Sequence, residues 1–219
     1  MDMDNLKLKA RTAVRPLVLM LDQAGFSPLA VSILGLVISI ASGFVVAAGH
    51  LFWGALVFLL GSAFDMLDGG LARLQGTASR RGAFLDSTFD RFGEGALFCG
   101  LAWFYTTGLA EAHPWAVVFI IGTVVGSLTT SYVRARAEGL GETCYVGLLQ
   151  RPERIALLVG GMILGWRLLQ VVLAFLALAT LATTVQRIIH VVRKLPASDP
   201  PDLKPGNPPG TPENPGGST

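Results

Sequence analysis

Long apolar segments separated by short polar loops dominate this chain and limit the folds open to it. Of its 219 residues 52% are hydrophobic, and the mean hydropathy is +0.56, which is too apolar for an ordinary soluble domain. A helix needs about twenty mostly apolar residues to cross a bilayer. Candidate spans cover residues 28–49, 51–72, 84–108, 114–134, 153–166 and 168–188, the fifth of them short. The sequence therefore predicts an all-α fold, a polytopic membrane helix bundle with six transmembrane helices.

The distribution of basic side chains predicts how this bundle is oriented. Lys and Arg gather on the cytoplasmic loops of membrane proteins. Here they precede the first span, follow the second, separate the fourth from the fifth and follow the sixth, whereas the three other loops hold only Arg167. We therefore expect a multi-pass protein of the cell membrane with both termini in the cytoplasm.

Two terminal segments flank the expected membrane domain of residues 28–190. Residues 6–24 alternate Leu, Val and Met with Lys and Arg, a pattern typical of an amphipathic helix lying along the inner membrane surface. We expect residues 1–27 to be a cytoplasmic juxtamembrane segment of this kind, with a merely solvated leader as the alternative. From residue 196 the chain is rich in Pro, Gly, Ser, Asp and Asn, and we expect residues 191–219 to be a disordered cytoplasmic tail.

Four aspartates lie within two of the apolar segments, where a charge is costly and usually functional. Asp65 and Asp68 are three residues apart, so they share one face of a helix. Asp86 and Asp90 are four residues apart and share a face of the next helix. If the two helices form a hairpin, all four carboxylates converge. Two Mg²⁺ or Mn²⁺ ions, which prefer oxygen ligands, would balance the four charges, so the sequence predicts a two-metal site at the cytoplasmic end of these helices.

Ion pairing and cation transport are two alternative roles for these aspartates. In the first, the carboxylates pair with neighbouring arginines in an exposed loop, but four aspartates in register with glycines and an arginine at membrane depth argue against it. In the second, they line a cation transporter. A transporter needs polar residues along its other spans, and the spans outside the motif are almost wholly apolar.

The aspartates belong to a longer motif that carries a family resemblance. The string D-x-x-D-G-x-x-A-R-x8-G-x-x-x-D-x-x-x-D runs from Asp65 to Asp90 and matches at every fixed position. It resembles the signature of the CDP-alcohol phosphotransferase family. Membership implies an integral membrane enzyme that moves a phosphatidyl group from a CDP-linked lipid to an alcohol and releases CMP.

The same resemblance implies a binding site for the donor, CDP-diacylglycerol. Residues 27–32, which lead into the first span, match the segment that contacts the CDP group in the family. Gly69 leaves room for a ligand to approach closely, and Arg73 can pair with a phosphate. The donor contacts implied by the resemblance are Leu29, Ala30, Val31, Ser32, Asp68, Gly69, Arg73 and Ser79.

Three strings in the second half of the chain indicate the acceptor. S-Y-V-R-A-R-A-E at residues 131–138, R-P-E-R at 151–154 and V-Q-R at 185–187 resemble the phosphatidylinositol phosphate synthases of actinobacteria and the archaeal archaetidylinositol phosphate synthases. In these prokaryotic membrane enzymes the acceptor is inositol 1-phosphate, also named 1D-myo-inositol 3-phosphate. The resemblance implies that Arg134, Arg154 and Arg187 line a pocket for its phosphate, supported by Arg136 and Arg151.

The residues leave the choice of substrates open in two respects. Glycerol 3-phosphate, the acceptor of phosphatidylglycerol phosphate synthases, also needs a basic pocket, so the arginines do not exclude it. An archaeal ether-lipid donor exposes the same CDP head as CDP-diacylglycerol. No nucleic-acid motif is present in the sequence, and no nucleic-acid partner is expected.

The resemblance also suggests a mechanism and an assembly. Asp65, Asp68 and Asp86 would hold the metal pair, while Asp90 would share the second metal and act as the general base for the attacking hydroxyl. A homodimer is expected from the family. Gly122 and Gly126, spaced as G-x-x-x-G, would allow close helix packing either between two subunits or within one.

Overall fold

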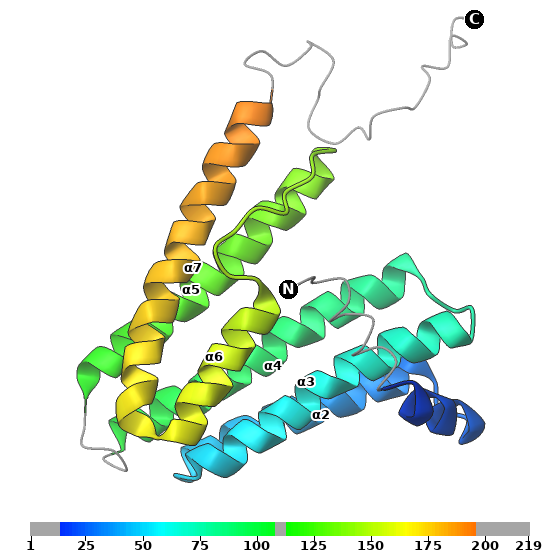
Figure 1. Ribbon diagram of the computed structural model, residues 1–219, viewed down its shortest axis with the longest axis horizontal. Helices are drawn as coiled ribbons and strands as arrows, with labels where there is room; N and C mark the ends of the chain where they lie inside the picture. The colour runs from blue at the N-terminus through cyan, green and yellow to red at the C-terminus, as the bar shows by residue number, and fades with distance from the viewer. Residues whose placement is uncertain (1–13, 108–112, 196–219) are drawn as a thin grey trace, which may run out of the picture.

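The structure, a computed structural model, describes residues 14–107 and 113–195. Residues 14–23 are helical and are followed by α2 (Pro28–Ala47), α3 (Leu51–Leu74), α4 (Arg80–Thr106), α5 (Pro114–Gly139), α6 (Arg151–Leu164) and α7 (Trp166–Lys194) (Figure 1). The described residues thus contain seven helices and no strand, which confirms the all-α prediction. The predicted juxtamembrane segment before residue 14 and the tail after residue 195 lie outside the described residues.

Local sequence signals explain where several helices begin. Pro28 and Pro114 occupy the first turns of α2 and α5, where a missing N–H does no harm. Ser27 and Ser79 cap α2 and α4, because their hydroxyls accept hydrogen bonds from Ala30 N and Gly82 N, each at 3.2 Å. These two serines set the ends of α2 and α4 that approach the predicted site.

The end of α7 corrects the predicted start of the C-terminal tail. The helix continues to Lys194, so residues 191–194 are its last turn rather than part of a disordered segment. Val191 is buried in a small core with Ala137 of α5 and Cys144 of the following loop. This burial stabilises a turn that composition alone assigned to the tail.

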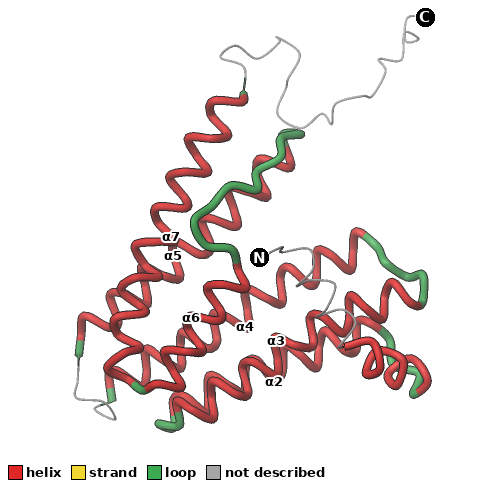
Figure 2. Tube along the Cα trace, in the orientation of Figure 1, coloured by secondary structure: helices red, strands yellow, loops and turns green. Residues whose placement is uncertain are grey.

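The helices form two groups joined along one side. α2 packs lengthwise against α3 and α4, and α5 packs lengthwise against α7. Contacts of α6 with α3 and α7, and of α4 with α5, connect the two groups. Figures 1 and 2 show that the two groups diverge along their length. α5 and α7 are farthest from α3 and α4 at the end where the loop joins α3 to α4. The aspartate motif lies near that end.

Contact between α2 and α4 depends on a pair of glycines. A Cβ placed on Gly43 of α2 would collide with Ala96 O of α4, and a Cβ on Gly100 of α4 would collide with Gly43 O. The two backbones therefore approach more closely than any larger residue allows. α3 and α4 make few direct contacts, so their common packing on α2 sets the distance between their aspartates.

The G-x-x-x-G pair of α5 packs within the subunit. A Cβ on Gly126 would collide with Thr180 of α7, and one on Gly122 would lie 3.2 Å from Ala177 Cβ. Beside this contact, Thr130 Oγ1 and Thr184 Oγ1 lie 2.8 Å apart. Of the two roles left open for these glycines, the structure shows the internal one.

Within residues 14–107 and 113–195, four helices are long and apolar enough to cross a membrane: α2, α3, α5 and α7. Together they indicate a membrane protein. α4 carries several charged residues in its first half, and α6 has only 14 residues, about 21 Å of helix against a hydrocarbon core of about 30 Å. The structure thus supports four of the six predicted spans by length and composition.

Candidate active site

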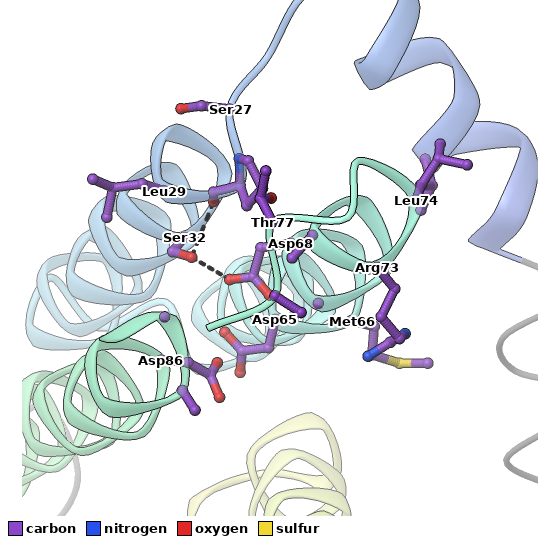
Figure 3. Close-up of a pocket in the computed structure, with 18 of the residues that line it drawn as sticks. Ser27, Leu29, Ser32, Asp65, Met66, Asp68, Arg73, Leu74, Thr77 and Asp86 are labelled. Carbon is purple, nitrogen blue, oxygen red and sulfur yellow. Dashed lines mark hydrogen bonds between the residues drawn. The ribbon is translucent and has the colours of Figure 1, made fainter. Parts of the chain in front are cut away.

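Three aspartates, Asp65, Asp68 and Asp86, form an acidic cluster. Asp65 and Asp68 lie one turn apart on α3, and Asp86 lies on α4. Each offers a carboxylate oxygen within 4.8 Å of the other two. Figure 3 shows the three carboxylates pointing toward one another from the two helices. The predicted hairpin therefore brings three of the four aspartates to one place.

A serine of α2 contacts this acidic cluster directly. Ser32 Oγ donates a hydrogen bond to Asp68 Oδ2, drawn as a dashed line in Figure 3. The hydroxyl lies one turn into α2, and Asp68 is only 5% exposed. α2 thus contributes a polar group to a site whose carboxylates come from α3 and α4.

Asp90, the fourth aspartate, lies beside Asp65 and also contacts two arginines. Its Oδ1 lies 2.6 Å from Arg151 Nη2, and its Oδ2 lies 3.6 Å from Arg91 Nη1. Arg151 is the first residue of α6, and its Nη1 also lies 3.2 Å from Asp65 Oδ2. The predicted base is therefore adjacent to the acidic cluster and shares one guanidinium group with it.

Glu94 also contacts this guanidinium, one turn after Asp90 on α4. Its Oε1 lies 3.3 Å from Arg151 Nε, and its Oε2 accepts a hydrogen bond from the Ser127 hydroxyl of α5 at 3.2 Å. Glu94 was not predicted from the sequence. A signal was available, because Glu94 continues the four-residue spacing of Asp86 and Asp90 into a segment expected to be apolar.

A cavity of about 950 Å³ opens beside the acidic cluster, between residues 14–19 and parts of α2, α3 and α4. All three carboxylates of the cluster line it, and Figure 3 shows this side of the site. Six of the eight predicted donor contacts also line the cavity: Leu29, Ser32, Asp68, Gly69, Arg73 and Ser79. The structure therefore gathers most of the predicted donor residues around one space next to the carboxylates.

The other two predicted donor contacts do not line this cavity. Val31 is 1% exposed and packs with Val18, Leu67 and Leu71 in the small core beneath it. Ala30 is exposed, outside the lining residues. Donor binding through their side chains stays a prediction.

The helix of residues 14–23 forms a wall that the motif does not predict. Val18 packs against α3, and Arg15 lines the cavity. Gln75, just after α3, donates from Nε2 to Asp22 Oδ1 at 2.9 Å and to Phe26 O at 3.1 Å. These two bonds fasten the chain on either side of the turn before α2 to the end of α3.

The three arginines predicted for the acceptor phosphate gather around residues 140–150. Arg187 of α7 is 8% exposed and donates from Nε to Val146 O and from Nη1 to Thr130 O, both at 2.8 Å. Arg134 and Arg154 lie close enough to Arg187 to interact with its charge. The structure therefore concentrates positive charge between α5, α6 and α7.

Arg154 and Arg134 differ in how their charges are satisfied. Arg134 Nε donates to Glu138 Oε1 at 2.8 Å, and its guanidinium lies 4.9 Å from the centre of the Tyr145 ring. By contrast, Nε and Nη1 of Arg154 are buried and have no hydrogen-bond partner among the residues that the structure describes. Arg154 thus has donors available for an anion.

The acidic cluster fits a divalent cation. Its three carboxylates supply hard oxygen donors from two helices, the ligand type that Mg²⁺ and Mn²⁺ prefer. Carboxylates this close repel one another unless a cation lies between them. Asp65, Asp68 and Asp86 are therefore the residues that would hold a metal.

Comparison with known proteins identifies the class to which this fold and site belong. Residues 26–186 match the profile of the CDP-alcohol phosphatidyltransferase family, and the chain belongs to that family. The match covers α2 to α6 and most of α7, including the whole aspartate motif. Membership supports an enzyme rather than a cation transporter.

Individual relatives carry a narrower name. The phosphatidylinositol phosphate synthase of Mycobacteroides abscessus is 39% identical over 190 residues, 84% of either chain. That of Mycolicibacterium smegmatis is 37% identical over 218 residues, 94% of this chain and 96% of the relative.

Solved structures agree with these relatives. The crystal structure of the Mycobacterium tuberculosis phosphatidylinositol phosphate synthase with CDP-DAG bound matches with a TM-score of 0.75 and 36% identity, over 80% of this chain and 92% of that one. The same enzyme in complex with manganese and citrate also gives 0.75, over 81% and 88%. A manganese complex of a relative agrees with a divalent metal at the acidic cluster.

Proposed function

We propose that this protein transfers the phosphatidyl group of CDP-diacylglycerol to a hydroxyl of inositol 1-phosphate, giving phosphatidylinositol phosphate and CMP. Relatives of 37% and 39% identity that are named for this product support the acceptor. The cavity beside the acidic cluster supports the donor, because it combines carboxylates, Ser32 and Arg73 with apolar residues such as Val18 and Leu29. Such a lining suits a ligand with a charged diphosphate and apolar chains.

Two buried nitrogens of Arg154, Nε and Nη1, have no hydrogen-bond partner among the described residues, and this observation carries the acceptor. Burying a charged donor without a partner costs several kcal/mol, so an anion is the natural complement. A phosphate accepts two parallel hydrogen bonds from an arginine. Arg154 lies one turn after Arg151, which reaches Asp65. The acceptor phosphate would therefore lie across the carboxylates from the donor cavity.

The four aspartates would have two roles at the reaction centre, metal binding and general-base catalysis. Asp65, Asp68 and Asp86 would hold two Mg²⁺ or Mn²⁺ ions per site, with Asp90 sharing the second. Bound divalent cations would polarise the diphosphate and stabilise the CMP leaving group. Asp90 would accept the proton of the inositol hydroxyl as that oxygen attacks the β-phosphorus. Direct in-line attack needs no covalent enzyme intermediate.

Residues around the donor would orient its diphosphate. Ser32 holds Asp68 in place, and Arg73 would pair with a phosphate. A Cβ on Gly69 would lie 3.4 Å from Arg73 Nη1, so the glycine leaves space for that guanidinium and for the ligand. Ser79 lines the cavity while capping α4.

The proposed setting is a prokaryotic cell membrane. α4 and α6 would complete six spans, with the termini and the active site on the cytoplasmic side, where basic loops concentrate. A water-soluble inositol phosphate would reach the site from that side. We also propose a homodimer, with α4 and α5 as its candidate surfaces.

The test is CMP release by purified protein in detergent with CDP-diacylglycerol and Mg²⁺. Inositol 1-phosphate, glycerol 3-phosphate, free inositol and serine are compared as acceptors. We expect release with inositol 1-phosphate only. Arg154→Gln should raise the KM for that acceptor by about tenfold or more, the value of a charge-assisted pair, and leave the KM for the donor unchanged. Arg193→Gln, an exposed arginine of α7, is the matched control. Release with glycerol 3-phosphate instead would overturn the acceptor.

A further inference from the structure

Arg151 places each of its three guanidinium nitrogens against a different carboxylate. Nε lies 3.3 Å from Glu94, Nη1 lies 3.2 Å from Asp65, and Nη2 lies 2.6 Å from Asp90. The side chain is 29% exposed and reaches from the start of α6 to both α3 and α4. One positive charge therefore bridges two proposed metal ligands and a third carboxylate that the reaction does not use.

We propose that Arg151 is an internal cation that competes with a divalent ion for Asp65 and Asp90, and that Glu94 retains it when the ion binds. This inference rests on the two-metal centre of the proposed function. In the structure Arg151 contacts Asp65 and Asp90, both of them proposed metal ligands. Glu94 is then a positioning residue, because its carboxylate would remain paired with the Arg151 guanidinium after the ion binds.

The contact with Asp90 is the closest of the three. Asp90 Oδ1 lies 2.6 Å from Arg151 Nη2, but this oxygen makes no hydrogen bond with a described residue. A charge contact without a hydrogen bond is weaker than a hydrogen-bonded pair, so a divalent ion held by Asp90 can replace it.

Glu94 is placed so that this withdrawal leaves no buried charge unpaired. Its Oε2 is held by Ser127 of α5, while Oε1 already faces Arg151 Nε. Removing one partner of a buried ion pair is strongly destabilising, and Glu94 would remain as a partner for Arg151. The other basic groups facing these carboxylates, Arg91 and Arg154, lie beside Asp90 and Glu94 and would remain there.

The sign of a change in metal affinity tests the proposal. Mn²⁺ binding is measured by electron paramagnetic resonance on the full-length protein in detergent, without donor or acceptor. Arg151→Gln should bind Mn²⁺ about tenfold more tightly than the wild type, since the competing charge is gone. Equal or weaker binding would overturn the competition, because an arginine that only supports the carboxylates would leave the site weaker when removed.

Mn²⁺ binding by Glu94→Gln provides a second test, which applies even if Arg151→Gln does not fold. Without this carboxylate Arg151 should stay on Asp65 and Asp90, so Mn²⁺ binding should weaken about threefold or more; unchanged or tighter binding overturns the proposal. In the double variant that weakening should disappear, because Glu94 acts only through Arg151. A double variant as weak as Glu94→Gln would instead make Glu94 a metal ligand and overturn its positioning role. CMP release by the wild type reports separately on the proposed function.

Discussion

Ser32 of α2 donates a hydrogen bond to Asp68 Oδ2 of α3 and so joins the predicted donor segment to the acidic cluster. Asp68 is almost fully buried, which means that water does not easily replace this bond. A hydroxyl in this position both orients a proposed metal ligand and lines the donor cavity. Its removal should therefore affect catalysis and donor binding together.

Ser32→Ala should lower kcat/KM for CDP-diacylglycerol by about tenfold or more. A hydrogen bond to a charged group contributes about 1.5–3 kcal/mol, and about 1.4 kcal/mol corresponds to tenfold. Ser32→Thr keeps the hydroxyl and serves as the matched variant, with most of the activity retained. Steady-state CMP release measures both. Wild-type efficiency in Ser32→Ala would show that the bond has no role in turnover.

Asp90→Asn should abolish turnover while leaving donor binding largely intact. The amide cannot accept the proton of the acceptor hydroxyl, whereas the donor cavity is lined by other residues. CMP release and binding of CDP-diacylglycerol are measured on the same preparation. Substantial CMP release by this variant would remove Asp90 from the role of base.

Gly100→Ala should destabilise the protein by about 1–3 kcal/mol, because the new methyl would meet the backbone of Gly43 on α2. Gly95→Ala on the same helix is the control, since nothing lies within 4 Å of its Cβ position. An alanine there should be neutral or stabilising by about 0.5–1 kcal/mol. Thermal unfolding in detergent compares the two. Equal midpoints would contradict the close approach of α2 and α4.

Gln75→Ala should raise the KM for the donor by about three- to tenfold with kcat within about twofold of the wild type. The loss of two hydrogen bonds, to Asp22 and to Phe26 O, frees the helix of residues 14–23 that walls the donor cavity. Gln23→Ala removes an exposed glutamine of that helix and should change neither constant. A fall in kcat at constant KM would instead place the effect of Gln75 on the carboxylates.

Much of the site could be predicted because it depends on local patterns. Spacings of three and four residues place Asp65 with Asp68 and Asp86 with Asp90 on any helix, whatever the rest of the fold. The length of the apolar segments and the sidedness of the basic residues likewise determine a membrane helix bundle before any contact is known. The family motif then follows from residues that are close together in the chain.

What the sequence by itself determined is therefore the all-α class, the membrane character and the presence of a carboxylate centre. Only the tertiary structure decided how the carboxylates meet. Common packing on α2 brings Asp86 to Asp65 and Asp68, while Arg151, 86 positions after Asp65, contacts both Asp65 and Asp90. Contacts over such separations depend on how helices pack, and helical periodicity carries no information about them. Glu94 combines both cases: its spacing places it on the helix face of Asp86 and Asp90, but its contacts with Arg151 and Ser127 appear only when α4, α5 and α6 lie together.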